Sequence, residues 1–405
     1  MVNFILTISL TTELKSIPIT DNKYLFTVAI WEIKTLNSTV NNMYLITNRV
    51  IKKGKGLGIF GKTPSPFGPN ELRAIDVSKT STGWSTKSVD DKLSLQEVEK
   101  LKTKYHLNID TTKDWYGSLT VACNLFEQAR TEGKSILFFV HGYNNDVGDV
   151  LKTAEEIEKL YNVIVVPFTW PANGGGAISG TASYLSDKSD ARASSGAINR
   201  FVGKISYYHA LLTEASLTEI RSKVDAKYHN NANPMAAASL YSELVNKSCV
   251  VKINLLCHSM GNYLLKHSLM TSDNATSDLV FDNICLVSAD TNNENHAHWV
   301  ESLDVRKRVY IVINEDDSAL QASRIKPGKQ QRARLGHYLK KLNSENAVYI
   351  DVTEADDVGS NHSYFKGNSV SRNSTLKAVF NQMFNGLTVE KDLEYISSIN
   401  CYRLR

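Results

Sequence analysis

From about Lys134 onward, short apolar runs rich in β-branched residues alternate with longer stretches of helical periodicity. The apolar runs are Ser135–Gly142, Asn162–Trp170, Val250–Ser259, Asn283–Asp290, Arg308–Asp317 and Asn346–Thr353. An amphipathic stretch, Val147–Tyr161, separates the first two. Near-continuous apolar strands that alternate with helices are typical of a parallel sheet covered on both faces. The pattern predicts an α/β fold with a mostly parallel central sheet and helices on both faces.

This alternation is interrupted between Ala172 and Asn246. The interruption opens with the glycine-rich string "NGGGAISG" and continues with helical periodicity around Ser206–Tyr228 and Pro234–Val245. Because it stands between two strands of the sheet, we expect residues 172–246 to form a helical cap over the strand ends.

The first 110 residues contain β-rich runs such as Lys23–Ile33 and Asn42–Val50. These runs could be the antiparallel edge of the same sheet or a small separate domain, and the sequence leaves both open. We expect residues 1–41 to be a β-rich extension and residues 42–405 to be the main domain.

Composition narrows the class of protein. Of 405 residues, 42% are hydrophobic and 22% are charged, as in an ordinary soluble globular protein. Basic and acidic residues number 46 and 42, a balance that argues against a nucleic-acid partner. No apolar run reaches the roughly 18 residues of a membrane span, and the N-terminus lacks the pattern of a signal peptide. Five cysteines form no C-x-x-C pair, so we expect a reducing cytoplasm, with unconventional secretion left open.

One string imitates a nucleotide-binding loop. Gly56–Thr63 matches the phosphate-binding pattern G-x-x-x-x-G-K-S/T. In that motif a helix starts at the Lys-Ser/Thr pair, but here Pro64 and Pro66 follow and disfavour a helix. We therefore expect a loop between strands and no phosphate site.

The string "CHSMG" has the pattern of a nucleophile elbow. An apolar strand leads into Ser259, and a helical stretch begins at Met260. The tight turn requires small residues on both sides of the serine. Gly261 meets this need, and Cys257 stands where glycine is usual. The pattern favours Ser259 as a nucleophile over a purely structural turn.

A nucleophilic serine needs a base, and the base needs an orienting acid. In this fold class they follow the serine in the order Asp/Glu, then His, after later strands. Asp317 is the first candidate for the acid and Asp316 the second, and His362, after the last strand, is the candidate base. His337 is a rival base, but we expect it to be a solvated histidine in a basic helical stretch.

An acyl-transfer site also needs backbone N–H groups that stabilise the oxyanion. The amide of Met260, directly after the serine, is one candidate. The amide of Tyr143, in the loop after the strand "SILFFVHG", is the other. We expect His141 to brace that loop and His258 to support the elbow.

The ordered set "FVHGYNND", "FTWPANG", "CHSMGN", "DDSAL", "RLG" and "NHSYF" resembles a bacterial alpha/beta-hydrolase family of unknown function, close to the lipase and esterase branches. The string "TNR" (Thr47–Arg49) looks like the start of that family's domain. The resemblance therefore covers roughly Asn42 to the C-terminus, with residues 172–246 the most divergent part.

The resemblance implies Ser259 as nucleophile, Asp317 as acid and His362 as base, with oxyanion amides at Tyr143 and Met260. The expected activity is that of a carboxylesterase or lipase-like hydrolase acting on a small-molecule or lipid-like acyl ester. It needs no metal, nucleotide or organic cofactor. An amidase or peptidase on the same residues, and a non-catalytic binding protein of this fold, remain alternatives. The oligomeric state stays open.

Two further patterns give weaker indications of a binding site. His296 and His298 lie near Asp290 and Glu294 at a spacing that a metal could use, although a solvated loop is the favoured interpretation. Asp290 is also the fallback acid. The basic stretch Ser323–Lys341 could contact an anionic substrate or a membrane surface, but a solvated helix face is favoured.

Overall fold

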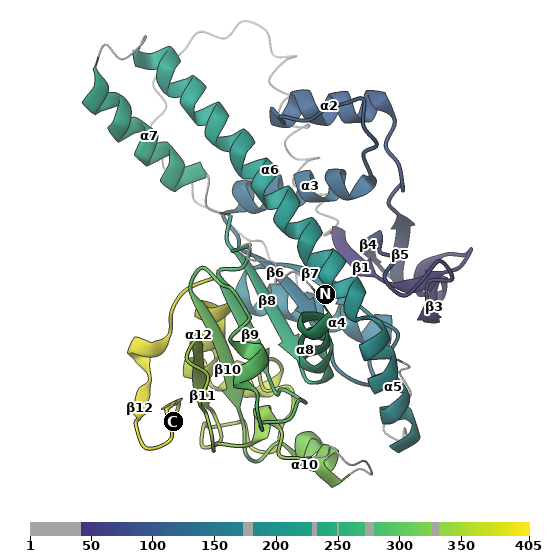
Figure 1. Cartoon of the computed structure of the whole chain (residues 1–405), viewed down its shortest axis with the longest axis vertical. Coiled ribbons are helices and arrows are strands. Elements are labelled where there is room, and N and C mark those ends of the chain that lie inside the picture. The colour runs from purple at the N-terminus through teal and green to yellow at the C-terminus, as the bar shows by residue number, and fades with distance from the viewer. Residues whose placement is uncertain (1–41, 173–180, 229–232, 249–250, 272–278, 326–331) are drawn as a thin grey trace, which may run out of the picture. The chain divides into compact units, whose positions relative to one another are not determined.

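The apolar runs pair into one 11-stranded sheet in the computed structural model (Figure 1). The structure describes residues 42–172, 181–228, 233–248, 251–271, 279–325 and 332–405, so the predicted extension 1–41 lies outside it. The strand order is β12-β13-β11-β10-β9-β8-β6-β7-β1-β4-β5.

The centre of the sheet is parallel. Its strands are β1 (Asn42–Thr47), β6 (Ile136–Val140), β7 (Ile164–Thr169), β8 (Ile253–His258), β9 (Asn283–Val287), β10 (Arg308–Ile313), β11 (Ala347–Asp351) and β13 (Cys401–Arg403). Antiparallel strands complete the edges: β4 (Arg73–Thr80), β5 (Gly83–Ser88) and β12 (Glu394–Ile396). The α/β prediction is confirmed. Strands β1, β4 and β5 are an edge of the main sheet and not a separate domain.

Helices cover both faces of the sheet. Neighbouring residues of a strand point to opposite sides, so a strand that is apolar at every position has side chains to bury on both faces. Phe138 belongs to the core beneath α3 (Gly117–Glu132), α6 (Ser195–Tyr228) and α8 (Met260–Thr271). Phe139 belongs to the core beneath α4 (Val147–Tyr161) and α12 (Ser374–Phe384). The other helices are α2 (Leu95–Tyr105), α5 (Thr181–Ala193), α7 (Pro234–Ser248), α9 (Ala297–Val300), α10 (Ser318–Ile325) and α11 (Asn368–Arg372). Within the described ranges, no helix is long and apolar enough to cross a membrane.

Helix α4 has the bounds that its amphipathic pattern predicts. The Asp146 side chain caps it by accepting a hydrogen bond from the amide of Asp149 at 2.9 Å. At the other end Asn162 takes a left-handed conformation with φ of 52° and stops the helix. The apolar face, which includes Leu151 and Ile157, is fully buried against the sheet.

Helices α5, α6 and α7 stand between β7 and β8 and occupy most of the segment that the sequence predicts as a cap, and α7 ends two residues beyond it. Helix α7 packs against the C-terminal half of α6 around a small core of Ile220, Val224 and Ala237. In Figure 1 this pair extends from the edge at which the parallel strands begin, whereas α5 lies near the edge at which they end.

The segment that matches the phosphate-binding pattern, Gly56–Thr63, folds differently from a nucleotide-binding loop. Gly56–Ile59 forms a short 3-10 turn, η1, and strand β3 (Phe60–Pro64) follows, paired with β2 (Arg49–Ile51). Lys62 and Thr63 thus lie in a strand and not at a helix start. We expected a loop here. The strand forms because Gly61 lets the backbone approach β2: a Cβ atom there would lie 2.2 Å from a methyl group of Val50.

Substitutions at two other glycines, one closely packed and one with open space around it, test how glycine permits close backbone packing in this fold. A Cβ atom at Gly261 would lie 2.5 Å from the carbonyl oxygen of Val140, so we expect Gly261→Ala to lower the free energy of unfolding by about 1–3 kcal/mol. A Cβ atom at Gly203, in α6, would meet nothing within 4 Å, so Gly203→Ala should raise that free energy by about 0.5–1 kcal/mol. Urea denaturation measures both. Equal effects of the two variants would contradict the account.

Candidate active site

Ser259 lies at the turn between β8 and α8 in a left-handed backbone conformation, with φ of 56°. For a residue with a side chain this conformation costs about 1–3 kcal/mol and persists only where the surroundings impose it. Here the amide of Ser259 donates to the carbonyl of Val287 at 3.1 Å, and its carbonyl accepts from the amide of Asp290 at 3.1 Å. The end of β9 therefore holds the turn in place.

The loop after β6 packs directly against this turn. A Cβ atom at Gly142 would lie 2.7 Å from the Ser259 Cβ and 3.2 Å from its Oγ. At Gly261 a Cβ atom would crowd the carbonyls of Val140 and His141. Both glycines are required by this close approach, which brings the loop that carries Tyr143 to the serine.

His362 and Asp317 form a hydrogen bond of 2.7 Å between Nδ1 and Oδ2. Asp317 is fully buried, and its second oxygen accepts the amide of Leu320 at 3.0 Å. Asp316 is exposed and bonds through its own amide to Asn314. Of the two candidate acids, Asp317 is the one in contact with the histidine.

The backbone of His362 is also held. Its carbonyl accepts hydrogen bonds from His258 Nε2 at 3.0 Å and from Ser288 Oγ at 2.9 Å. Burial, and next the neighbouring His362, hold the pKa of His258 well below its usual range, so His258 stays neutral. This neutral ring supports the loop that bears His362.

Ser259 and His362 line the same cavity, of about 300 Å³, together with Gly142, Tyr143 and Tyr184 of α5. No hydrogen bond within the described ranges joins Ser259 Oγ to His362. In unliganded hydrolases this bond is often long and shortens only when substrate binds. The structure therefore brings Ser259, Asp317 and His362 close to one cavity, with the last two already hydrogen-bonded.

His141 braces the loop after β6, as its position predicts. The ring is buried and stacks on Trp170 with centroids 5.2 Å apart. Its Nδ1 donates to the carbonyl of Gly142 at 2.9 Å, and its Nε2 accepts from the Trp170 amide at 3.3 Å. Burial lowers the pKa of His141 to about 3, so it is neutral and unsuited to act as a base at neutral pH.

Sequence reasoning gave no role to Arg49, which ties three segments together around the site. The side chain is 3% exposed and donates to Thr169 Oγ1 and to the carbonyls of Gly61, Ala172 and, at 3.5 Å, Asn145. Burial lowers its pKa to about 10, so it stays charged at neutral pH. The string "TNR" (Thr47–Arg49) is the part of the sequence from which a role for Arg49 could have been predicted.

Arg334 was also missed, and it forms a buried ion pair with Asp290. Arg334 Nε lies 3.0 Å from Asp290 Oδ1, and neither side chain is more than 4% exposed. Tyr184 donates to Asp290 Oδ2 at 2.9 Å, and Ser323 donates to Oδ1 at 2.7 Å. Asp290, the fallback candidate for the acid, thus pairs with Arg334 and not with a histidine. The cavity gains a polar wall from Asp290, Tyr184 and Ser323.

The prediction of a solvated basic helix is wrong for residues 334–337. Arg334 is buried, and His337 is 7% exposed in a 3-10 turn, η3 (Leu335–His337). Gly336 is the reason, because a Cβ atom there would lie 2.2 Å from the amide of Ala289. The turn therefore sits against the end of β9, which basic charge alone does not reveal.

Two of the candidate metal ligands, His296 and Asp290, are engaged within the protein. His296 Nδ1 donates to the carbonyl of Asn293 at 2.7 Å, and its Nε2 accepts from the hydroxyl of Tyr349 at 2.5 Å. Asp290 pairs with Arg334. In the part of the chain that the structure describes, no group of three or more His, Cys, Asp or Glu residues could hold a metal ion.

The buried ion pair generates a stability prediction. Arg334→Met leaves the Asp290 carboxylate buried without its cation, so we expect the free energy of unfolding to fall by about 3–5 kcal/mol. Adding Asp290→Leu removes the stranded charge and should recover most of that loss. Arg332→Met, at an exposed arginine two residues away, should cost under about 1 kcal/mol. Urea denaturation of the variants measures this, and equal losses in Arg334→Met and Arg332→Met would rule the account out.

Comparison with known proteins gives one match. Two segments, residues 121–213 and 211–377, match a family described as "Alpha/beta hydrolase of unknown function (DUF900)". Together they cover more than half of the chain and contain Ser259, Asp317 and His362. No curated protein and no solved structure gives a significant match.

Proposed function

We propose that this chain, which belongs to the alpha/beta-hydrolase family that it matches, is a serine hydrolase that cleaves acyl esters through Ser259, His362 and Asp317. The observation that carries the proposal is the 2.7 Å hydrogen bond from His362 to the buried Asp317, in the cavity that Ser259 also lines. A buried carboxylate on Nδ1 selects the tautomer whose Nε2 can accept a proton.

In the first half-reaction, Ser259 Oγ attacks the ester carbonyl as His362 Nε2 takes the hydroxyl proton. The carbonyl oxygen becomes an oxyanion, stabilised by the amides of Met260 and Tyr143. Collapse of this intermediate breaks the bond to the alcohol, which leaves with the proton from His362. Asp317 remains ionised throughout and stabilises the imidazolium.

In the second half-reaction, His362 takes a proton from water, and the resulting hydroxide attacks the acyl group on Ser259. As the second tetrahedral intermediate collapses, His362 returns this proton to Ser259 Oγ and a carboxylic acid is released. Because the same two amides face the oxyanion in both steps, the site needs no movement of the elbow between them.

The cavity favours a compact acyl ester with polar groups. Its volume, about 300 Å³, is at the lower end of the roughly 300–1,000 Å³ found for ligand pockets. Tyr184, Asp290 and Ser323 give one polar wall, and Lys366 adds a cation. The place of Tyr184 in this wall supports α5 as the part of the predicted cap that limits access to Ser259.

Reaction with a fluorophosphonate tests the proposal without knowledge of the natural substrate. We expect intact mass spectrometry to show one covalent adduct on the native protein and none on Ser259→Ala. Ser363→Ala, at a second serine that lines the cavity, should label like the native protein. Labelling that survives in Ser259→Ala, or its absence from the folded native protein, would refute the proposal.

Asp317→Asn tests the acid. An asparagine at this position would hold His362 in the wrong tautomer, so we expect the rate constant of phosphonylation to fall about 10³–10⁴-fold. Asp316→Asn, at the exposed neighbour, should change it less than about threefold, since the group makes no contact with the histidine. Time courses of labelling, quenched at set intervals, give the phosphonylation rate constants of both variants. Circular dichroism shows whether each variant is folded. Similar rates for the two variants would exclude Asp317 as the acid.

A further inference from the structure

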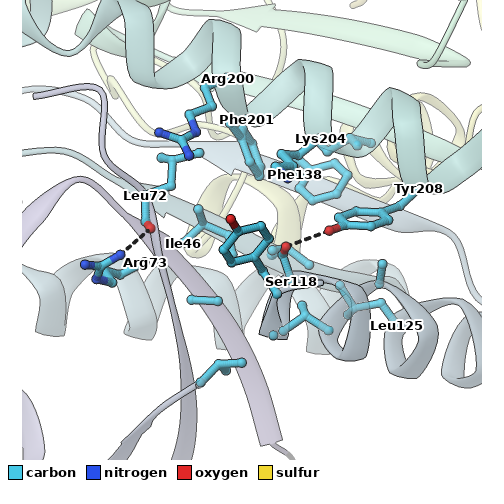
Figure 2. Close-up of a pocket in the computed structure, with 18 of the residues that line it drawn as sticks. Ile46, Leu72, Arg73, Ser118, Leu125, Phe138, Arg200, Phe201, Lys204 and Tyr208 are labelled. Carbon is cyan, nitrogen blue, oxygen red and sulfur yellow. Dashed lines mark hydrogen bonds between the residues drawn. The ribbon is translucent and has the colours of Figure 1, made fainter. Parts of the chain in front are cut away.

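A second cavity, of about 500 Å³, lies between the sheet and helices α3 and α6 (Figure 2). Its walls are mainly apolar and include Val121, Leu125, Phe138, Phe201, Ile205 and Leu212. It shares no lining residue with the cavity at Ser259. Since Phe138 lines this cavity and Phe139 lines the other, the two lie on opposite sides of β6.

Two cations of α6, Arg200 and Lys204, stand at the mouth of this cavity (Figure 2). The ammonium of Lys204 lies 5.6 Å from the ring centre of Tyr116 and 5.7 Å from that of Tyr208. Within the described ranges neither cation forms an ion pair with a carboxylate. Burial, and next the positive charge of Arg200, lower the pKa of Lys204.

The rest of the mouth carries three carboxylates, those of Glu71, Asp90 and Asp91, and one cation, Arg73. Arg73 pairs with Glu71 and, at 3.3 Å, with Asp91. The carboxylate of Asp90 is exposed to water. Helix α3 begins beside Lys204, and its N-cap residue supplies no side-chain hydrogen bond, so the helix dipole adds to the positive potential on the α6 side.

The interior suits an apolar chain. Of the hydroxyl groups on its wall, those of Ser118 and Tyr208 bond to each other at 2.7 Å (Figure 2). The volume is well within the range of ligand pockets. An occupant therefore gains by burying hydrocarbon inside and by presenting a negative charge at the mouth.

We propose that this cavity binds an amphiphile with one apolar chain and a carboxylate headgroup, a medium-chain fatty acid in chemical class. The chain lies among the apolar walls, and the carboxylate lies between Arg200 and Lys204. This site is separate from Ser259, and its occupancy does not depend on the catalytic proposal.

Calorimetric titration of the full chain with decanoate, decanol and decylammonium, below their critical micelle concentrations, tests the proposal. We expect one decanoate per chain, bound about tenfold more tightly than decanol, because a charge-assisted contact exceeds a neutral one. Decylammonium should bind more weakly than decanol. Ser259→Ala should bind decanoate like the native protein, and the variants below locate the bound molecule.

Three variants locate the bound molecule. Ala122→Phe places a ring in the cavity and should weaken decanoate and decanol alike by about tenfold or more. Arg200→Ala with Lys204→Met should remove the preference for decanoate over decanol and leave decanol binding unchanged. Arg221→Ala, at an exposed arginine of α6 away from the cavity, should change neither.

Decanol that binds as tightly as decanoate would overturn the assignment of the headgroup. Absence of binding by all three amphiphiles, or binding that Ala122→Phe leaves unchanged while the variant remains folded, would overturn the site itself.

Discussion

At Ser259 the chain turns from β8 into α8 within one residue, and it does so with a φ of 56°. Such a turn survives only where other segments crowd it from both sides. Gly142 and Gly261 leave room for that crowding, and hydrogen bonds to Val287 and Asp290 complete it. The position of the serine, and of the loop after β6 that packs against it, follows from this one constraint.

Buried charges hold the segments around the elbow. Arg49 joins the N-terminal strands to the loops after β6 and β7, and Arg334 joins the end of β9 to α5 and α10 through Asp290, Tyr184 and Ser323. Burying a charge is costly unless it is paired or fully hydrogen-bonded, and both arginines meet that condition. The network gives the loops one defined arrangement. It also gives the cavity at Ser259 a polar wall, in contrast to the apolar cavity under α6.

The strands and the order of the candidate triad could be predicted from the sequence because both depend on local signals. The run "INLLCH" is buried on both faces, and Ser259, Asp317 and His362 each follow the end of a strand. Parallel strands bring such positions to the same edge of the sheet, so chain order alone indicated that they would lie close together.

Long-range pairing could not be predicted in this way. The burial of Arg334 depends on Asp290, 44 positions earlier, and on a glycine that fits against β9. A basic stretch reads as a solvated helix when its partners are unknown. Long-range pairing also explains why Lys62 lies in a strand, since that strand pairs with β2. Helix α6 begins at Ser195, well before the periodic stretch that predicted it.

The most direct measurement is a crystal structure of the protein after reaction with a fluorophosphonate. The account predicts phosphorus bonded to Ser259 Oγ, with the phosphoryl oxygen about 3 Å from the amide nitrogens of Tyr143 and Met260, and with His362 Nε2 facing the Ser259 oxygen. An adduct on another side chain, or a phosphoryl oxygen directed away from both amides, would contradict it.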